Sequence, residues 1–356
     1  MKTLKVLDWP AYRFYSDSHP LHKWSRKLRE HDIKVEFYSD HKSPKLHGAD
    51  YLFIHSRYFE NGWQDTYKRN DENENDLVNY LSWMKAKVGK LIWFDAADST
   101  GSSDFPIINL VDAFVKKQLH KDLTYYTNKT NAGLRVWLNN ESKQHQITFE
   151  PCPAGDLHKL KLGWNIGLND YRYYGYKMSR LSNYLSYKLY PSRFQSVDSG
   201  RKFDLTFRGT IHKDQGYGLS NQRNKVLSLL NSLNRNVVSG KPVAKKQYLQ
   251  ELKSSKVSIS PYGWGEVCYR DFETLISGAL LIKPAMEHLD TYPNVYIPGE
   301  TYLPVLWSLN DLEEKLEYAL SNYQSLKLIA ENGQQVYKKA VNDGDAFVEI
   351  IKNIVG

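Results

Sequence analysis

The pattern of apolar and polar positions between residues 257 and 284 predicts a strand, a loop, a helix and a second strand. Residues 257–259 alternate as in a short strand, and helical spacing of apolar positions begins at Tyr269. Gly278 is placed to cap the end of that helix, and the apolar run 279–282 is typical of a strand buried on both faces. The loop between the first strand and the helix contains residues that break regular structure: Pro261, Gly263 and Gly265.

A loop that leads into a helix N-terminus predicts an anion-binding site, because free backbone N–H groups and the positive end of the helix dipole point to the same place. Arg270 adds a fork of donors suited to a diphosphate. Glu273 lies one turn further along the helix, where a carboxylate is placed to accept hydrogen bonds from ribose hydroxyls. Gly265 and Tyr269 flank the same loop and complete the donor-binding candidates of this unit.

The run RDFETLISGALLIKP at 270–284 resembles the donor-binding signature of GT-B glycosyltransferases, in which a glutamate is followed five positions later by glycine and then by an apolar strand. The arginine three positions before that glutamate is similar to the version in the spore-coat-like and exostosin-like bacterial branches. The resemblance implies that Arg270 and Glu273 bind a nucleotide sugar. Many retaining members carry two glutamates separated by seven residues, whereas six separate Glu266 from Glu273, so Glu266 is a catalytic candidate and the stereochemistry stays open.

Strands and helices alternate along the rest of the chain, which predicts doubly wound parallel sheets. A chain of 356 residues favours two domains. Together with the resemblance, this predicts a GT-B-like α/β fold with two such domains facing each other across a cleft. We place an acceptor-binding domain at 1–195, a nucleotide-sugar-binding domain at 196–340, and at 341–356 a last helix that in GT-B chains often crosses back to the first domain. Residues 311–341 read as helical with a glycine break.

Polar residues follow several predicted strands, and strand ends face the ligand crevice in open α/β sheets. His55 and Arg57 are acceptor-binding candidates for this reason. Lys116 is a further acceptor-binding candidate, because the run DAFVKKQL at 112–119, which contains Lys116 and Lys117, resembles a run found in capsule and lipopolysaccharide glycosyltransferases. Arg208 and Gly209 end the first strand of the second domain, and the resemblance implies that this loop faces the donor diphosphate.

Asp95 and Asp98 follow the apolar strand LIWF, within a phrase that resembles one found in capsule and lipopolysaccharide glycosyltransferases. A carboxylate in this position is suited to act as general base on an acceptor hydroxyl, and we expect partial burial to raise its pKa. The alternative is that either aspartate caps the loop by accepting backbone N–H bonds.

The composition, with 41% hydrophobic and 25% charged residues, is that of a globular protein with a proper core. A net charge of +8 favours an anionic partner such as a nucleotide sugar, an acidic glycan or an anionic membrane. The basic residues are scattered, which argues against nucleic acid. The two cysteines do not suit a disulfide framework or a metal site. No D-x-D pair lies in a suitable loop, so we expect no metal and no cofactor.

The N-terminus lacks an apolar run, so we expect a cytoplasmic protein, peripheral at the inner face of the cell membrane. The predicted function is transfer of a sugar from a nucleotide-diphosphate sugar to a hydroxyl of a glycan or lipid-linked glycan destined for the cell surface. A nucleotide-sugar epimerase and a non-catalytic glycan-binding or nucleic-acid-binding protein are the alternatives.

Overall fold

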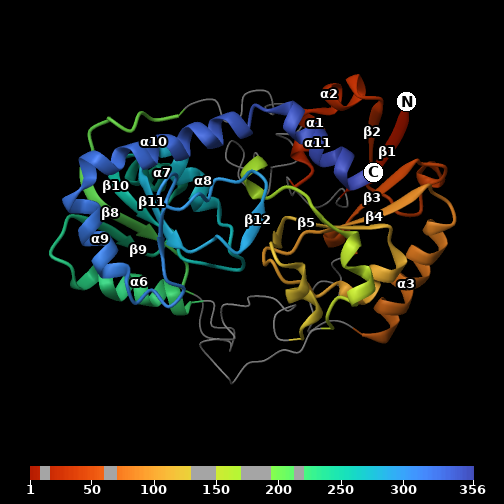
Figure 1. Cartoon of the computed structure of the whole chain (residues 1–356), viewed down its shortest axis with the longest axis horizontal. Coiled ribbons are helices and arrows are strands. Elements are labelled where there is room, and N and C mark those ends of the chain that lie inside the picture. The colour runs from red at the N-terminus through yellow and green to blue at the C-terminus, as the bar shows by residue number, and fades with distance from the viewer. Residues whose placement is uncertain (9–16, 60–69, 130–149, 170–193, 212–219) are drawn as a thin grey trace.

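The computed structural model describes residues 1–8, 17–59, 70–129, 150–169, 194–211 and 220–356. Two parallel sheets lie side by side, each with helices packed on it (Figure 1). This confirms the predicted α/β architecture with two parallel sheets.

The first sheet has six parallel strands in the order β2-β1-β3-β4-β5-β7. Its strands are β1 (Lys2–Leu7), β2 (Ile33–Tyr38), β3 (Tyr51–His55), β4 (Lys90–Asp95), β5 (Ala113–Lys116) and β7 (Leu160–Leu162). The associated helices are α1 (His19–Lys23), α2 (Ser25–Glu30) and α3 (Asp71–Lys85). The central strands β3, β4 and β5 are buried along almost their whole length, as expected for a parallel sheet covered on both faces.

The second sheet has five parallel strands in the order β13-β11-β10-β8-β9. Its strands are β8 (Phe203–Arg208), β9 (Val237–Gly240), β10 (Ser255–Ile259), β11 (Leu280–Pro284) and β13 (Leu303–Val305). Its helices are α6 (Asn221–Ser232), α7 (Lys245–Lys253), α8 (Tyr269–Ser277), α9 (Leu312–Ser321) and α10 (Tyr323–Ala340). The unit β10–α8–β11 is the strand–loop–helix–strand pattern predicted from the sequence.

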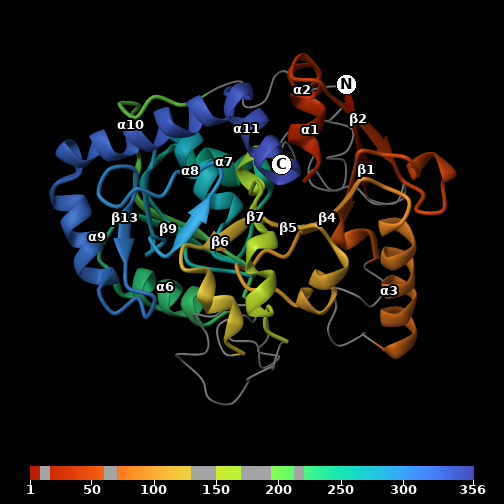
Figure 2. The same ribbon diagram turned by 45° about the vertical axis from the view of Figure 1, so that its right-hand side comes forward.

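Two further elements join the sheets. Strand β6 (Gln118–His120), which lies between β5 and β7 in the chain, pairs antiparallel with β12 (Leu289–Thr291), which lies between β11 and β13. The last helix, α11 (Gly344–Val355), packs against β5, β7 and α2, so both chain ends lie beside the first sheet (Figure 2). The Lys90 ammonium group donates hydrogen bonds to the carbonyls of Val355 (2.8 Å) and Gly356 (2.6 Å).

One hydrophobic cluster runs through the junction. Trp164 of the first half, Phe272 and Tyr337 of the second half and Phe347 of α11 are all members, and all are almost completely buried. The two sheets therefore share core surface, which favours a fixed arrangement of the two halves.

The break predicted at a glycine within the helical stretch 311–341 lies at a different residue. The helical stretch divides at Asn322, between α9 and α10, and Gly333 stays inside α10. A Cβ atom at Gly333 would lie 2.7 Å from the Thr301 carbonyl oxygen and 2.8 Å from a methyl group of Leu275. The glycine therefore permits close packing of α10 rather than ending the helix.

Gly278 caps α8 in the left-handed conformation, with φ of 69°. We expect Gly278→Ala to lower the free energy of unfolding by more than Gly299→Ala does. Both glycines have positive φ, which costs an L-residue about 1–2 kcal/mol. Only at Gly278 would the new Cβ also lie 2.7 Å from a backbone oxygen, that of Gln195, whereas nothing lies within 4 Å at Gly299.

Urea unfolding of the two variants measures both effects, and the Gly299 variant isolates the backbone cost. Equal losses would show that the segment around Gln195 moves aside without cost.

Candidate functional site

A cavity of about 740 Å³ lies where the loops of the two sheets meet. Asp98 and Ile166 line it from the first half of the chain. The remaining lining residues come from the second half: Arg208, Gly209, Thr210, Arg223, Pro242, Val243, Lys245, Tyr248, Gly263, Trp264, Gly265, Val267, Cys268, Tyr269, Arg270 and Glu273. All six predicted donor-binding residues thus line one cavity, and one of the three predicted catalytic residues, Asp98, lines it as well.

The start of α8 is held by a buried carboxylate, Asp271. Its side chain accepts hydrogen bonds from the backbone N–H of Cys268 (3.0 Å), from the Tyr296 hydroxyl (2.7 Å) and from the Ser260 hydroxyl. The fully buried ammonium group of Lys283 lies 3.2 Å from the same carboxylate. These contacts fix the 261–268 loop and aim the N-terminus of α8 at the cavity.

The 261–268 loop also touches the first half of the chain. A Cβ atom on Gly265 would lie 1.7 Å from the Asp98 carbonyl oxygen, so only glycine permits this approach. Next to it, the Glu266 carboxylate accepts a hydrogen bond from the Thr100 backbone N–H at 2.9 Å. Glu266 is buried and does not line the cavity, and burial raises the pKa of its carboxyl to about 7.

Two guanidinium groups stand together at the cavity wall. Arg270 donates to the Arg208 carbonyl and lies over the Phe207 ring, 4.8 Å from the ring centroid. Arg223, from the first turn of α6, donates to the Thr210 carbonyl at 2.7 Å. In the part of the chain that the structure describes, neither has a carboxylate at ion-pair distance, and the Nε atom of each is buried without a hydrogen-bond partner.

Burial, together with repulsion from Arg270, lowers the pKa of Arg223 from its ordinary value. The two arginines therefore repel each other, and no carboxylate of the described segments lies at ion-pair distance from either. An oxyanion bound between them would relieve that repulsion.

Arg208 lines the cavity, but its side-chain donors are already engaged. Its guanidinium donates to the Glu251 carboxylate at 2.9 and 3.1 Å and to the Ser239 carbonyl at 2.6 Å. Arg223, which was not singled out from the sequence, lines the same cavity and lies close enough to Arg270 for their charges to repel. Gly209 lines the cavity as predicted.

Glu273 lies at the inner end of the cavity, and only 6% of its side chain is exposed. Its carboxylate accepts hydrogen bonds from the Tyr248 hydroxyl (3.0 Å) and the Lys245 ammonium group (3.3 Å). Both partners come from α7 and were not singled out from the sequence. The apolar stripe of α7 predicted a helix, but nothing in it indicated that its polar face would meet Glu273.

The two candidate bases lie in different environments. Asp95 is 1% exposed and pairs with the equally buried Lys116 at 2.6 Å, since the two residues are direct partners in the β4–β5 ladder. Asp95 also accepts from the Ser102 hydroxyl (2.6 Å) and the Ala97 backbone N–H (2.9 Å). Asp95 thus caps its loop, as the alternative held, and neither Asp95 nor the acceptor candidate Lys116 reaches the cavity.

Asp98, in contrast, lines the cavity, and 40% of its side chain is exposed. The expected rise in the pKa of these carboxyls does not occur. For each, burial favours a higher pKa, but a neighbouring cation outweighs it and holds the pKa below its ordinary value. That cation is Lys116 for Asp95, and for Asp98 it is Lys117 together with Arg57.

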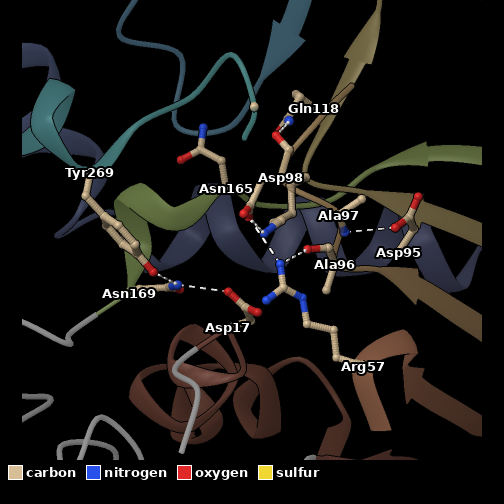
Figure 3. Close-up of polar contacts among 12 residues, drawn as sticks. Asp17, Arg57, Asp95, Ala96, Ala97, Asp98, Gln118, Asn165, Asn169 and Tyr269 are labelled. Atoms are coloured by element: carbon tan, nitrogen blue, oxygen red, sulfur yellow. Dashed lines mark hydrogen bonds and ion pairs between the residues drawn. The ribbon is translucent and has the colours of Figure 1, made fainter. Parts of the chain in front are cut away.

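His55 is buried at the end of β3, where its Nε2 atom lies 3.1 Å from the Asp17 carboxylate, and it does not line the cavity. The other oxygen of Asp17 accepts from the Asn169 amide at 2.9 Å, and that amide nitrogen lies 3.4 Å from the Tyr269 hydroxyl (Figure 3). Arg57 lies beside this network and reaches Asp98. His55 and Arg57, which were predicted to bind the acceptor, therefore contact residues that support the cavity wall. Tyr269, on the other side of the cavity, is linked to this network through Asn169.

Trp264 is a further residue that sequence reasoning missed. Half of this side chain is exposed at the cavity, on the loop between two glycines. An exposed indole at a cavity is suited to stacking on a flat ring or on the apolar face of a sugar.

Among the described residues, no group of three or more histidine, cysteine, aspartate or glutamate side chains is arranged to hold a metal ion. None of the helices described is long and apolar enough to cross a membrane.

The chain resembles solved structures in fold. No protein-family model and no curated protein sequence matches it. An α-glucosyltransferase solved with UDP and a 13-mer DNA aligns over 99% of both chains at 7% identity, with a TM-score of 0.50. Anabaena HepE, solved with UDP-glucose, aligns over 99% of both chains at 10% identity and a TM-score of 0.42. An α1,3-fucosyltransferase aligns over 99% of this chain and 90% of its own at 12% identity and a TM-score of 0.42. The likeness to the α-glucosyltransferase, the one of these three with a TM-score of 0.50, concerns fold alone.

We expect Glu266→Gln to become more stable relative to the parent protein as the pH rises from 5 to 8. Burial raises the pKa of Glu266 to about 7, above the ordinary value, so the protonated form is favoured in the folded state. The stability associated with this group is therefore fully present at low pH and is lost as the pH rises through about 7. Glutamine stays neutral and keeps an oxygen for the Thr100 N–H.

The measurement is the difference in melting temperature between variant and parent at each pH. Glu314→Gln, an exposed acid on α9, is the control, and its difference should stay level. A level difference for Glu266→Gln as well would show that its carboxyl is not protonated in the folded protein near neutral pH.

Proposed function

We propose that this protein is a glycosyltransferase that moves a sugar from a nucleoside-diphosphate sugar to an acceptor hydroxyl. The observation that carries the proposal is the cavity itself. On one wall lie the N-terminus of α8 and two arginines that have no carboxylate at ion-pair distance among the described residues, and an exposed carboxylate lies on the other. The first wall suits a leaving diphosphate, and the second suits a hydroxyl that must lose its proton.

The leaving group would be stabilised by the guanidinium groups of Arg223 and Arg270 and by the backbone N–H groups at the start of α8. Negative charge develops on the diphosphate as the bond to the sugar breaks, and donors fixed in advance stabilise that charge without having to reorganise. Glu273, held by Tyr248 and Lys245, is placed further along α8, where a ribose hydroxyl would lie.

Asp98 is the candidate base. Its carboxylate would take the proton of the acceptor hydroxyl while that oxygen bonds to the anomeric carbon and the bond to the diphosphate oxygen breaks. This single displacement inverts the anomeric configuration. Because Lys117 and Arg57 keep the pKa of Asp98 low, the carboxylate is ionised at neutral pH.

For the acceptor we propose a glycan or lipid-linked glycan of the cell surface, reached at the inner face of the membrane. The support is the resemblance of the 95–101 phrase and of the 270–284 run to bacterial glycosyltransferases of this kind. The α-glucosyltransferase of similar fold was solved with DNA, so duplex DNA belongs among the acceptors assayed.

We expect Arg223→Ala and Arg270→Ala each to weaken the binding of a nucleoside diphosphate, and Arg270→Lys to weaken it less than Arg270→Ala. Alanine removes the charge and the bidentate fork, whereas lysine keeps a point charge. Thermal stabilisation by UDP, GDP and dTDP, compared with CMP, measures the effect, since a ligand at 100 times its Kd adds roughly 2.7 kcal/mol.

Arg26→Ala, an exposed arginine on α2, is the matched control and should bind as the parent does. If neither cavity arginine affects binding, or if no nucleotide stabilises the parent, the assignment of the donor site is lost.

We expect Asp98→Asn to keep donor affinity and to lose turnover by about 10²–10⁴-fold, because a general base acts in the transition state. The assay presents the donor that binds with oligosaccharide, lipid-linked glycan and duplex DNA acceptors, and it determines the anomeric configuration of the product.

Asp95→Asn is the contrasting variant. It should lower stability by about 3–5 kcal/mol, because it leaves the buried Lys116 without its counter-charge. A fully active Asp98→Asn variant, or a product of retained configuration, would exclude Asp98 as the base.

A further inference from the structure

We infer that Lys117 and Arg57 are positioning residues for the base: they bind one oxygen of Asp98 and leave the other to the acceptor hydroxyl. The inference rests on the proposed function and deepens it, since it concerns how the base is oriented and kept ionised. Lys117 was passed over in the sequence in favour of its neighbour Lys116, and Arg57 was expected to bind the acceptor itself.

Both cations contact the same atom. The Lys117 ammonium group lies 2.9 Å from Asp98 Oδ1, and Arg57 Nη2 lies 3.3 Å from that same oxygen. In the described part of the chain no donor contacts Asp98 Oδ2. Because 40% of the Asp98 side chain is exposed and the residue lines the cavity, Oδ2 is the oxygen that a bound hydroxyl can reach.

The backbone of Asp98 is held as firmly as its side chain. The Gln118 amide donates to the Asp98 carbonyl at 2.6 Å, and Gly265 packs against that carbonyl from the opposite half. Arg57 Nη2 also donates to the Ala96 carbonyl at 3.0 Å, so the guanidinium spans the loop that carries Asp98 (Figure 3). With main chain and Oδ1 both fixed, the direction of Oδ2 is set before any substrate binds.

The charged and titratable groups around Asp98 come from four segments. Lys117 follows β5, Arg57 follows β3, Asp17 precedes α1, and Tyr269 begins α8. Asp17 opposes ionisation of Asp98, but it is itself placed near Lys117 and Arg57. Lys117 and Arg57 thus act on both Asp17 and Asp98. Their combined effect keeps the pKa of Asp98 below its ordinary value and so favours its ionised form.

This arrangement has a consequence for the pH dependence of turnover. The base works only when ionised, so the rate falls as the pH drops through its pKa. Removal of Lys117 leaves Asp98 with Arg57 alone and with the repulsion of Asp17, so the fall should begin at a higher pH. Substitution of Lys117 by arginine keeps the charge and should largely preserve the parent profile.

The test measures kcat from pH 3 to pH 8 for the parent and for Lys117→Met, Lys117→Arg, Arg57→Met and Lys121→Met, because the low pKa of Asp98 places the acidic fall of the parent below pH 3.8. We expect the acidic fall in kcat to shift to higher pH in Lys117→Met and in Arg57→Met, with donor affinity unchanged by calorimetry. Lys121→Met removes an exposed lysine four positions along the chain and should leave the profile as in the parent. Melting temperatures of all variants show whether each is folded across the pH range.

The outcomes separate the inference from the function on which it rests. If Asp98→Asn abolishes turnover while Lys117→Met and Arg57→Met keep the parent profile, Asp98 remains the base and the positioning role is overturned. A Lys117→Met variant that loses donor binding would also overturn it, because the lysine would then act on the donor. If Asp98→Asn is fully active, it is the proposed base that fails.

Discussion

The close approach of Gly265 to the Asp98 carbonyl is the constraint on which the site depends. It brings the loop that begins α8 against the loop that follows β4, with no room for a side chain between them. The hydrogen bond from Thr100 to Glu266 lies beside it and joins the same two loops. The proposed donor-binding wall at α8 and the proposed base Asp98 after β4 thereby line the same cavity, and their separation is set by backbone contact rather than by flexible side chains.

This contact needs a rigid support on each side. On the second sheet the support is the buried pair of Asp271 and Lys283, which would be costly to desolvate if the carboxylate were not also hydrogen-bonded to Ser260, Tyr296 and the Cys268 backbone. On the first sheet the support is the Asp95–Lys116 pair within the β4–β5 ladder. The Asp271–Lys283 pair supports the 261–268 loop, and the Asp95–Lys116 pair supports the loop that follows β4. The β6–β12 ladder and α11 then hold the two sheets together.

The fold was largely predictable because its signals are local. Strands buried on both faces appear as apolar runs, and α8 has both an apolar stripe and a left-handed glycine cap at Gly278. The grouping of Gly265, Tyr269 and Arg270 at one cavity was predictable for the same reason, since the loop, the helix start and Arg270 lie close together in the sequence. The presence of Arg223 at the same cavity was not predictable. It belongs to another helix, and the β8–β10 pairing of the sheet brings it near Arg270.

The acceptor side shows why strand-end residues resist prediction from sequence. Asp95 and Asp98 both follow an apolar strand, and Lys116 and Lys117 are adjacent, so composition alone treats the members of each pair alike. The parallel register sets Lys116 opposite Asp95 and buries both, and the next lysine, just past the strand end, is then left to meet Asp98 at the cavity. The Asp95–Lys116 pair is therefore enclosed in the sheet, whereas the Lys117–Asp98 pair lies at the cavity, where we propose that it orients a base. The two pairs differ by a step of one residue at the end of β5, and this step determines whether the carboxylate faces protein on all sides or faces the cavity on one.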